Sequence, residues 1–346
     1  MFKRQVVIVI TVTILSLFIS CVENQQQSPF GELQLQNVES SVLLDDQVIF
    51  PLKTVREGDK LYVTDRSNKP SVWIFRIDEA NDLHLFKELG REGRGGGEFL
   101  APDQIFPQSD GSGKFVYDTG GRKLVGINNQ FEIESNEYSF RSSGMPTNIH
   151  SISEDRFLIT GILPESRFEI YEKKDFELIK SESFGEMTSL GDQFGNLHLA
   201  SAWRSQSVYH SGLERIALFS SYAERIELYA VDGELLHTVS SDENGVPKVS
   251  YVGSEFVFEN DAIISYVSAT SDENYIYALY SGKNYGDEGA GNGTILHVFD
   301  WALNFIEGLQ LDHYSVSISA DNDGKIYSTQ NHPESAIKLI ELNLAD

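Results

Sequence analysis

The chain has 346 residues, of which 52 are Asp or Glu and 27 are Lys or Arg, so its formal net charge at pH 7 is −25. A surface of this sign repels phosphate backbones and anionic lipid headgroups, which argues against nucleic-acid binding and against a basic face that docks on a membrane. The single cysteine allows no internal disulfide, so core packing must stabilise the folded body.

The first residues have the layout of an export signal. Met1–Arg4 is basic, Val6–Ile19 is a nearly continuous apolar run, and the small residue Ser20 precedes Cys21. The run is short for a membrane span, and this order of regions is typical of a leader that is removed. We therefore predict a signal peptide over residues 1–20.

Cys21 directly follows this signal. Leu17–Cys21 resembles the lipobox of bacterial lipoproteins, with Phe18 where the usual pattern prefers Leu. The resemblance implies that the thiol is acylated and that lipid chains alone hold the protein on a bilayer. The alternative is that Cys21 is an ordinary residue of the leader. Residues 21–29 are polar and are predicted to form a flexible tether, followed by a folded domain over residues 30–346.

A short strand pattern of apolar and aromatic residues, usually opened by Gly or Asp, occurs six times in the folded domain. Successive copies are 54, 42, 59, 60 and 50 positions apart. Propeller blades, each a small antiparallel sheet, recur about every 40 to 50 residues. The spacing predicts an all-β fold, a six-bladed β-propeller in which each copy is the inner strand of a blade. The copies are Gly58–Asp65, Gly113–Asp118, Glu154–Thr160, Leu213–Leu218, Glu273–Leu279 and Asp323–Ser328.

A ring of sheets must be closed at its last blade, because open strand edges invite pairing with other chains. Propellers commonly close the ring with a strand from the N-terminus. The sequence offers Leu33–Phe50 for this role, and we expect it to pair with Ala336–Leu342.

Gly90–Pro102 reads Gly-Arg-Glu-Gly-Arg-Gly-Gly-Gly-Glu-Phe-Leu-Ala-Pro and resembles the glycine loop of NHL-type propellers. With the lipobox and the six-fold repeat, the chain is similar to the TolB-like six-bladed propeller lipoproteins of Bacteroidetes-type bacteria. The resemblance covers the whole mature chain, although only the glycine loop is a specific motif. It implies an exported protein anchored by lipid in the outer membrane, on either its periplasmic or its surface face, and it implies no particular reaction.

The sequence supplies no clear catalytic motif. The glycine run leads into Glu-Phe-x-x-Pro rather than a helix, which disfavours a phosphate loop. Ala320–Gly324 looks like part of a calcium loop, but Ser319 and Gln330 occupy its first and twelfth positions, so a hairpin turn is favoured. The eight histidines are scattered, although a propeller can gather one ligand per blade on its axis. We expect no catalytic residue, no metal and no cofactor.

In a propeller, the residues that follow the equivalent strand of every blade lie at the same end of the axis, where a ligand can bind. These candidate ligand-binding residues are Asp65, Arg66, Asp118, Arg122 and Thr160, together with His313. The alternative for Asp65 and Asp118 is a role in forming turns.

Ala202–His210 is a second candidate region. It contains Trp203, Arg204, Tyr209 and His210, the kinds of side chain that dominate binding hot spots. The alternative is a pair of strands whose aromatic side chains face the core.

The leading interpretation is a lipid-anchored, non-catalytic propeller of the cell envelope that binds an unknown protein, peptide or glycan. An enzyme with an axial metal, like the propeller lactonases and lyases, is the alternative, and a purely structural spacer is a third possibility. Metal analysis of the purified protein distinguishes the first two.

Overall fold

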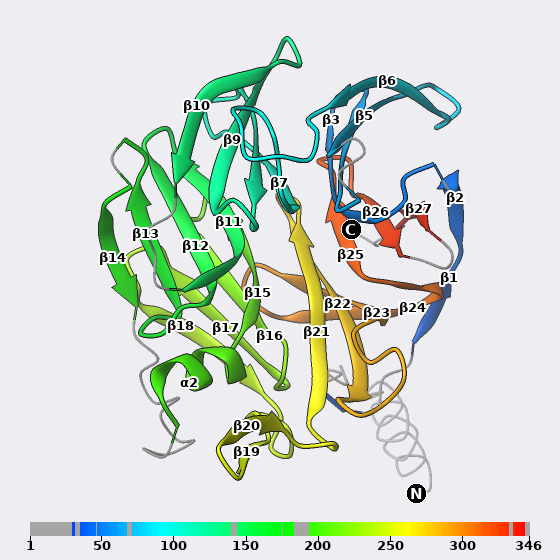
Figure 1. The fold of residues 1–346 in the computed structure, drawn as a ribbon. Helices are drawn as coiled ribbons and strands as arrows, with labels where there is room; N and C mark the ends of the chain where they lie inside the picture. Colours follow the sequence, from blue (N-terminus) through cyan, green and yellow to red (C-terminus); the bar gives the residue numbers. More distant parts are fainter. Residues whose placement is uncertain are drawn as a thin grey trace, which may run out of the picture.

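The computed structural model describes residues 30–31, 35–45, 47–67, 71–139, 144–174, 176–182, 194–331 and 335–342. The predicted signal, the tether and the lipidation site Cys21 lie outside these ranges. Six sheets surround one axis, as Figure 1 shows, and a separate two-stranded hairpin lies outside them.

The first three blades are antiparallel sheets in which the chain runs strand by strand from the axis to the rim. Blade 1 consists of β3 (Pro51–Glu57), β4 (Lys60–Asp65), β5 (Val72–Ile77) and β6 (Leu83–Leu89). Blade 2 consists of β7 (Pro102–Pro107), β8 (Gly113–Asp118), β9 (Lys123–Asn128) and β10 (Ile133–Ser139). Blade 3 consists of β11 (Met145–Ser153), β12 (Arg156–Ile162), β13 (Phe168–Glu172) and β14 (Leu178–Glu182).

The other three blades follow the same order and recruit two strands from the N-terminal segment. Blade 4 consists of β15 (Ser205–His210), β16 (Arg215–Ser220), β17 (Arg225–Ala230) and β18 (Leu235–Ser240). Blade 5 consists of β21 (Ile263–Ser271), β22 (Tyr275–Asn284), β23 (Gly293–Asp300), β24 (Phe305–Ser315) and β1 (Gln36–Val38). Blade 6 consists of β25 (Ser317–Ala320), β26 (Lys325–Gln330), β27 (Ala336–Glu341) and β2 (Ser40–Asp45).

Within the part of the chain that the structure describes, two elements stand outside this repeat, and Figure 1 places both at the lower edge of the disc. They are the short helix α2 (Asn196–Ala202) and the hairpin of β19 (Val249–Val252) and β20 (Glu255–Phe258). Within the described ranges, no helix has the length and apolar character needed to cross a membrane.

The six repeated sequence patterns correspond to β4, β8, β12, β16, β22 and β26, so the predicted blade count is confirmed. They are the second strand of each blade, however, and not the innermost strand as expected. The innermost ring is formed by β3, β7, β11, β15, β21 and β25, each of which contacts its two neighbours. The second strands, such as β4 and β8, are covered on both faces and almost entirely buried. Burial on both faces favours apolar side chains at successive positions, which explains why these strands carry the recognisable apolar pattern.

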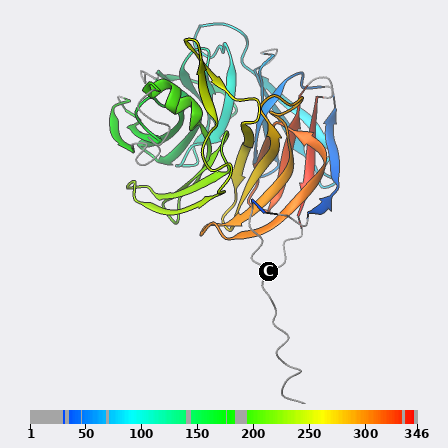
Figure 2. The ribbon, with the colours of Figure 1, turned by 90° about the horizontal axis from the view of Figure 1, so that it is seen from below.

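The N-terminal segment closes the ring as predicted. β2 pairs antiparallel with β27, with Ser40 opposite Ile340 and Asp45 opposite Ala336. β1 was not foreseen as a separate strand, and it pairs parallel with β24 of the preceding blade. Figure 2 shows these N-terminal strands beside the last blades. One short segment thus joins blades 5 and 6.

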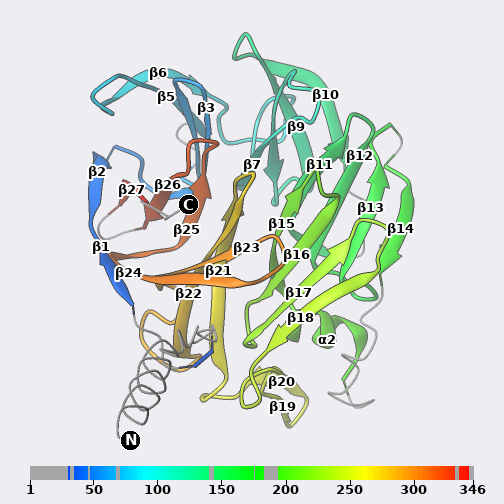
Figure 3. The same ribbon diagram turned by 180° about the vertical axis from the view of Figure 1, so that it is seen from behind.

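Aromatic side chains fill the spaces between blades, as the composition indicates. Phe115 of blade 2 and Phe157 of blade 3 are both fully buried, and their ring centroids are 5.3 Å apart in an edge-to-face arrangement. Figure 3 shows these blades from the opposite side. This packing fixes the positions of the inner strands that surround the axis.

Candidate functional site

A cavity of about 680 Å³ lies on the propeller axis. All six innermost strands line it, so it is formed by the complete ring rather than by any one blade. Many of its side chains are polar. One polar lining residue from each blade in turn is Lys53, Gln104, His150, Ser207, Thr270 and Ser319.

The cavity opens at the face that carries the turns between the first and second strands of each blade. We call this face the hairpin face. Gly58 and Asn322, which belong to two such turns, are part of the cavity lining. The register confirms the direction, because Glu57 pairs with Lys60 beside the turn whereas Pro51 pairs with Asp65 at the far end.

β-bulges aim several of the cavity side chains. The register of β3 against β4 shifts between Pro51 and Thr54, which places Lys53 in the bulge. Similar shifts precede Gln104 in β7, Asn148 in β11 and Ser268 in β21. A bulge bends a strand and re-aims a side chain, and bulges are common next to functional sites.

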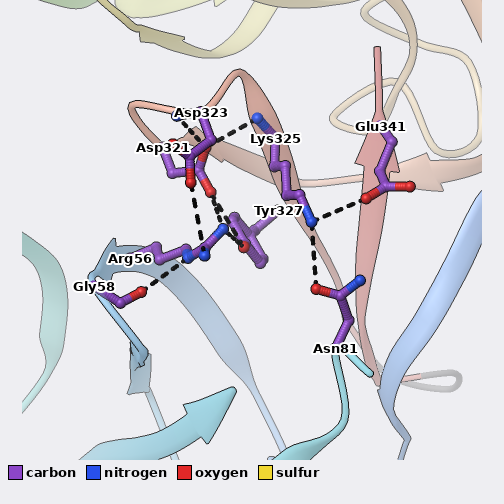
Figure 4. A network of polar contacts seen from close by, with 8 residues as sticks. All are labelled: Arg56, Gly58, Asn81, Asp321, Asp323, Lys325, Tyr327 and Glu341. Carbon is purple, nitrogen blue, oxygen red and sulfur yellow. Dashed lines mark hydrogen bonds and ion pairs between the residues drawn. The ribbon is translucent and has the colours of Figure 1, made fainter. Parts of the chain in front are cut away.

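An ion-pair network holds one side of the mouth (Figure 4). Arg56 of β3 forms an ion pair with Asp321 and donates a hydrogen bond to the Tyr327 hydroxyl at 2.9 Å. Asp321 also accepts hydrogen bonds from the backbone N–H groups of Asp323 and Lys325, which confirms that this segment forms a hairpin turn. The network ties blade 1 to blade 6.

Lys53 lies deeper on the axis. Its Nζ donates to Ser268 Oγ at 3.2 Å, and burial lowers its pKa to about 8, although Asp103 acts in the opposite direction. Burial also lowers the pKa of His150 to about 4, helped by the charge of nearby Lys53. His150 is therefore neutral at pH 7, while Lys53 carries most of its positive charge.

Hydrogen bonds join the wall across blades 2, 3 and 4. The Gln104 amide donates to the Ile149 carbonyl at 3.0 Å and accepts from the Ile149 N–H at 2.8 Å. His150 Nε2 lies 2.9 Å from Ser207 Oγ. Asn148 Oδ1, in contrast, is buried and has no hydrogen-bond partner within the described residues. A buried acceptor without a partner is costly, so this atom is a natural contact for a ligand.

A second hollow of about 350 Å³ lies beside the axial cavity at the hairpin face. The two share Phe106, Pro107, His150 and Tyr209 in their linings, and the second extends outward past Gln108. Gln108 Nε2 is also buried without a partner in the described part of the chain. A ligand longer than the axial cavity can therefore extend along the hairpin face between blades 2, 3 and 4.

Comparison with known families and structures agrees with the six-bladed fold. The family described as TolB-like 6-blade propeller-like matches residues 30–323. The chain belongs to this TolB-like propeller family. No curated protein gives a significant match to the sequence.

Solved structures similar to this TolB-like propeller share its fold at low sequence identity. A putative exported protein from Bacteroides fragilis is 12% identical with a TM-score of 0.57, covering 90% of this chain and 95% of that one. A DUF4221-family member from Bacteroides vulgatus is 11% identical with a TM-score of 0.54, covering 91% and 99%. A streptogramin B lyase is 12% identical with a TM-score of 0.50, covering 88% and 97%. Likeness at these identities establishes the fold alone.

In the TolB-like propeller, the residues predicted from the strand ends lie away from the cavity mouth. Asp65 is fully buried and accepts hydrogen bonds from the backbone N–H groups of Ile49 and Phe50. Asp118 is equally buried and accepts from Leu100 and Ala101. Both carboxylates therefore hold the incoming segment of their blade, in keeping with the turn-forming alternative.

The other strand-end candidates are dispersed. Arg66 forms an ion pair with Asp103 at 2.8 Å, and Arg122 donates to the Gly144 carbonyl at 3.1 Å. His313 is buried between Asp312 and Ser328, each 2.7 Å from one of its ring nitrogens. Thr160 lies closest to the cavity, because its Oγ1 is 2.8 Å from the wall residue Ser207.

The second predicted region divides between core and cavity. Trp203 is buried, and Arg204 lies over the Tyr222 ring at 5.1 Å. His210 Nε2 lies 3.1 Å from the Glu273 carbonyl oxygen, and its ring packs edge-on against Trp301. Tyr209 lines both hollows.

Sequence reasoning missed Lys53, Asn148 and His150, although a usable signal exists. Each of these residues lies in the strand immediately before a strongly apolar repeat copy. The strand that precedes each apolar repeat copy is the innermost strand, and its polar side chains Lys53, Asn148 and His150 face the axis. Once the order of strands in a blade is known, these polar residues can be assigned to the cavity wall.

Proposed function

We propose that this chain is an exported propeller, anchored by lipid on Cys21 to the outer membrane, that binds a segment of a protein, peptide or glycan without catalysis. The ligand occupies the axial cavity and enters from the hairpin face. The observation that carries the proposal is a cavity of about 680 Å³ lined by all six blades that contains a buried acceptor, Asn148 Oδ1, without a partner.

The dimensions support a ligand larger than an ion. Small-molecule sites typically enclose about 300 to 1,000 Å³. The second hollow adds about 350 Å³, and Gln108 Nε2 in its lining, which has no partner within the described residues, offers a further donor. A chain-like ligand with alternating polar groups fits this pair of hollows better than a compact apolar one.

Export and anchoring are supported by the sequence of the leader and by one relative. The basic start, the apolar run and the lipobox-like residues before Cys21 form one consistent signal. One protein of the same fold is described as a putative exported protein. Labelling cells with a palmitate analogue tests this part: the wild-type chain should be labelled, whereas Cys21→Ser should not. Label on the Cys21→Ser chain would contradict lipidation at this residue.

The alternative, an enzyme with an axial metal, needs several ligands to converge. The described residues contain no group of three or more His, Cys, Asp and Glu that could hold a metal ion. His150 and Ser207 do form a hydrogen-bonded pair, but the lowered pKa of His150 makes it a weak general base at pH 7. The wall is therefore better suited to binding than to proton transfer.

Blocking the mouth tests the proposed site. Asn322 is exposed in the β25–β26 turn and lines the cavity, so Asn322→Trp should narrow the entrance. Asn274 is exposed in the equivalent turn of blade 5, outside the lining residues, and Asn274→Trp is the matched control. Libraries of peptides and glycans are screened against wild-type protein by thermal shift, and hits are measured by calorimetry.

We expect Asn322→Trp to weaken binding at least about tenfold and Asn274→Trp to leave it unchanged. Mass spectrometry should recover the ligand chemically intact after incubation. Equal affinities for the two variants would rule out the axial cavity as the site, and conversion of the ligand would rule out a non-catalytic role.

A further inference from the structure

Lys53 differs from the other cations around the cavity because no carboxylate among the described residues forms an ion pair with it. Arg56 is paired with Asp321, and Lys114 is paired with Glu57 at 2.7 Å. Among the described residues, Lys53 has no acidic oxygen within 4.0 Å, and its Nζ donates one hydrogen bond, to Ser268. The nearby Asp103 is instead paired with Arg66. An ammonium has three N–H donors, so Lys53 retains donors for a ligand.

Blade 3 supplies an acceptor that needs a hydrogen-bond donor, whereas Lys53 supplies donors that need an acceptor. Asn148 is 3% exposed, lines the same cavity, and its Oδ1 lacks a donor within the described residues. His150 follows two positions later in β11 and lies close enough to Lys53 for the lysine charge to depress its pKa. The cavity therefore contains an unneutralised cation and an unsatisfied acceptor on walls that face a common space.

We propose that the axial cavity binds a monocarboxylate that carries a hydroxyl or amide N–H close to the carboxylate. The carboxylate pairs with Lys53 Nζ, and the neighbouring donor hydrogen-bonds to Asn148 Oδ1. This inference rests on the proposed function and specifies the chemistry of the group that enters the cavity. Sugar acids and the C-terminal residue of a peptide both present this chemistry.

The charges favour one negative charge over two. Lys53 is the cation left unpaired, and His150 stays neutral at pH 7 because of its lowered pKa. The carboxylates at the mouth, Asp321 and Glu57, are already paired with Arg56 and Lys114, so Lys53 can balance one negative charge. A phosphate dianion would keep a second negative charge within a chain that carries −25 overall. A fully neutral ligand would leave the ammonium of Lys53 without a counter-charge.

Calorimetry on the purified protein at pH 7 tests the assignment with defined probes. Glucuronate supplies a carboxylate with adjacent hydroxyls, and N-acetylalanine supplies one with an adjacent amide N–H. Galactose lacks the charge, acetate lacks the donor, and inorganic phosphate replaces the carboxylate. We expect at least one of the first two to bind at least about tenfold more tightly than galactose, acetate or phosphate, and the better of the two identifies the source.

Three variants test whether the positive charge at position 53 binds the carboxylate. Lys53→Met should weaken the best carboxylate at least about tenfold, Lys53→Arg should retain most of the affinity, and the exposed Lys174→Met should bind like the wild type. A crystal structure of the wild-type protein with the same ligand gives a readout that does not depend on any variant. It should show the carboxylate within hydrogen-bond distance of Lys53 Nζ.

Two outcomes distinguish this inference from the proposed function. If only neutral ligands bind, and Asn322→Trp weakens them, the cavity is a binding site but the carboxylate assignment is wrong. If the carboxylate binds with equal affinity to Lys53→Met, or lies elsewhere in the crystal, the role of Lys53 is wrong. Failure of every ligand class to bind the wild-type protein overturns both.

Discussion

Lys53 Nζ on β3 lies 3.2 Å from Ser268 Oγ on β21, so its side chain bridges two blades that flank β25 of blade 6. Ser268 Oγ also accepts the Ile318 N–H of β25 at 3.2 Å. One serine hydroxyl therefore links three inner strands, and the buried ammonium beside it borders the axial cavity. Burying the charge of Lys53 should therefore lower the stability of the fold, while the same charge is available to the proposed ligand.

Replacing Lys53 with Met should stabilise the ligand-free protein at pH 7. The pKa of Lys53 falls from 10.5 in the unfolded chain to about 8 in the fold, so its full charge-burial cost applies below pH 8 and disappears above pH 10.5. The shift corresponds to about 3.5 kcal/mol at about 1.4 kcal/mol per pKa unit. Less about 1 kcal/mol for the lost hydrogen bond, we expect a gain of about 2–3 kcal/mol in the free energy of unfolding.

Urea unfolding of Lys53→Met at pH 7 and pH 9.5 checks this, with exposed Lys174→Met as the control. The gain should shrink at the higher pH. A variant that is less stable than the wild type at pH 7 would show that the charge of Lys53 is compensated inside the fold. A gain in stability with a loss of ligand affinity would mark Lys53 as a residue retained for function.

Acid should destabilise the fold through its buried histidines. Burial lowers the pKa of His150 to about 4 and that of His297 to about 3. Between pH 6.5 and these values the unfolded chain binds protons that the folded chain excludes, so the free energy of unfolding decreases as the pH falls. His150→Gln should remove about 2 kcal/mol of the decrease between pH 7 and pH 4.5.

The measurement is the urea midpoint at both pH values, with His84→Gln as the control because the His84 side chain is 62% exposed. An unchanged pH dependence in His150→Gln would show that folding does not lower the pKa of His150. His297 should account for a further share, because its Nε2 is buried without a hydrogen-bond partner in the described residues.

A buried ion pair should hold blades 3 and 4 together. Arg167 Nη2 lies 2.8 Å from Glu227 Oε2, and neither side chain is more than 2% exposed. Arg167 also donates to Ser205 Oγ at 2.9 Å. Arg167→Met leaves Glu227 with Arg225 as its remaining ionic partner, and we expect a loss of about 3 kcal/mol in the free energy of unfolding.

Combining Arg167→Met with Glu227→Leu should cost less than the sum of the two single changes, because the double variant buries no uncompensated charge of this pair. Denaturant unfolding of the four proteins in this cycle gives the coupling energy. Strict additivity would contradict the proposed coupling.

Two residues of the glycine loop, Gly90 and Gly96, differ in the space available for a side chain. Gly90 has φ +73°, and a Cβ there would lie 2.6 Å from Phe99 Cε2. Gly96 has no such φ, and its Cβ would meet no atom within 4 Å. Gly90→Ala should therefore cost about 2–4 kcal/mol in unfolding free energy, and Gly96→Ala less than about 0.5 kcal/mol. Thermal and urea unfolding decide the question, and equal losses would show that the loop adapts around either side chain.

The fold was predictable because one strand per blade carries a pattern that burial on both faces imposes. β4 and β8 show this directly, and the closing strand followed from the need to cover an open edge. The innermost strands were misassigned because their axis-facing residues are polar. β3 reads Pro-Leu-Lys-Thr-Val-Arg-Glu, which sequence alone does not distinguish from a solvent-facing strand.

The site was less predictable for a geometric reason. Lys53 and Asn148 follow register shifts, and a bulge disrupts the two-residue alternation on which a facing assignment depends. Tyr209 was nominated for its side-chain type and does line the cavity, whereas Asp65 and Asp118 were nominated for strand position and hold backbone N–H groups. The aspartates at the ends of the repeated strands therefore proved to be turn-forming residues and not part of the cavity wall.

The pairing of β1 with blade 5 and of β2 with blade 6 has a mechanical consequence. A pull applied at the N-terminal end reaches two adjacent blades through strands that lie along the direction of the chain. Hydrogen bonds in such ladders run across the strands, so the force loads many of them in shear at the same time instead of opening them one by one. Pulling at the N-terminal end should therefore require a larger force to open the ring than pulling on a strand whose hydrogen bonds break one at a time.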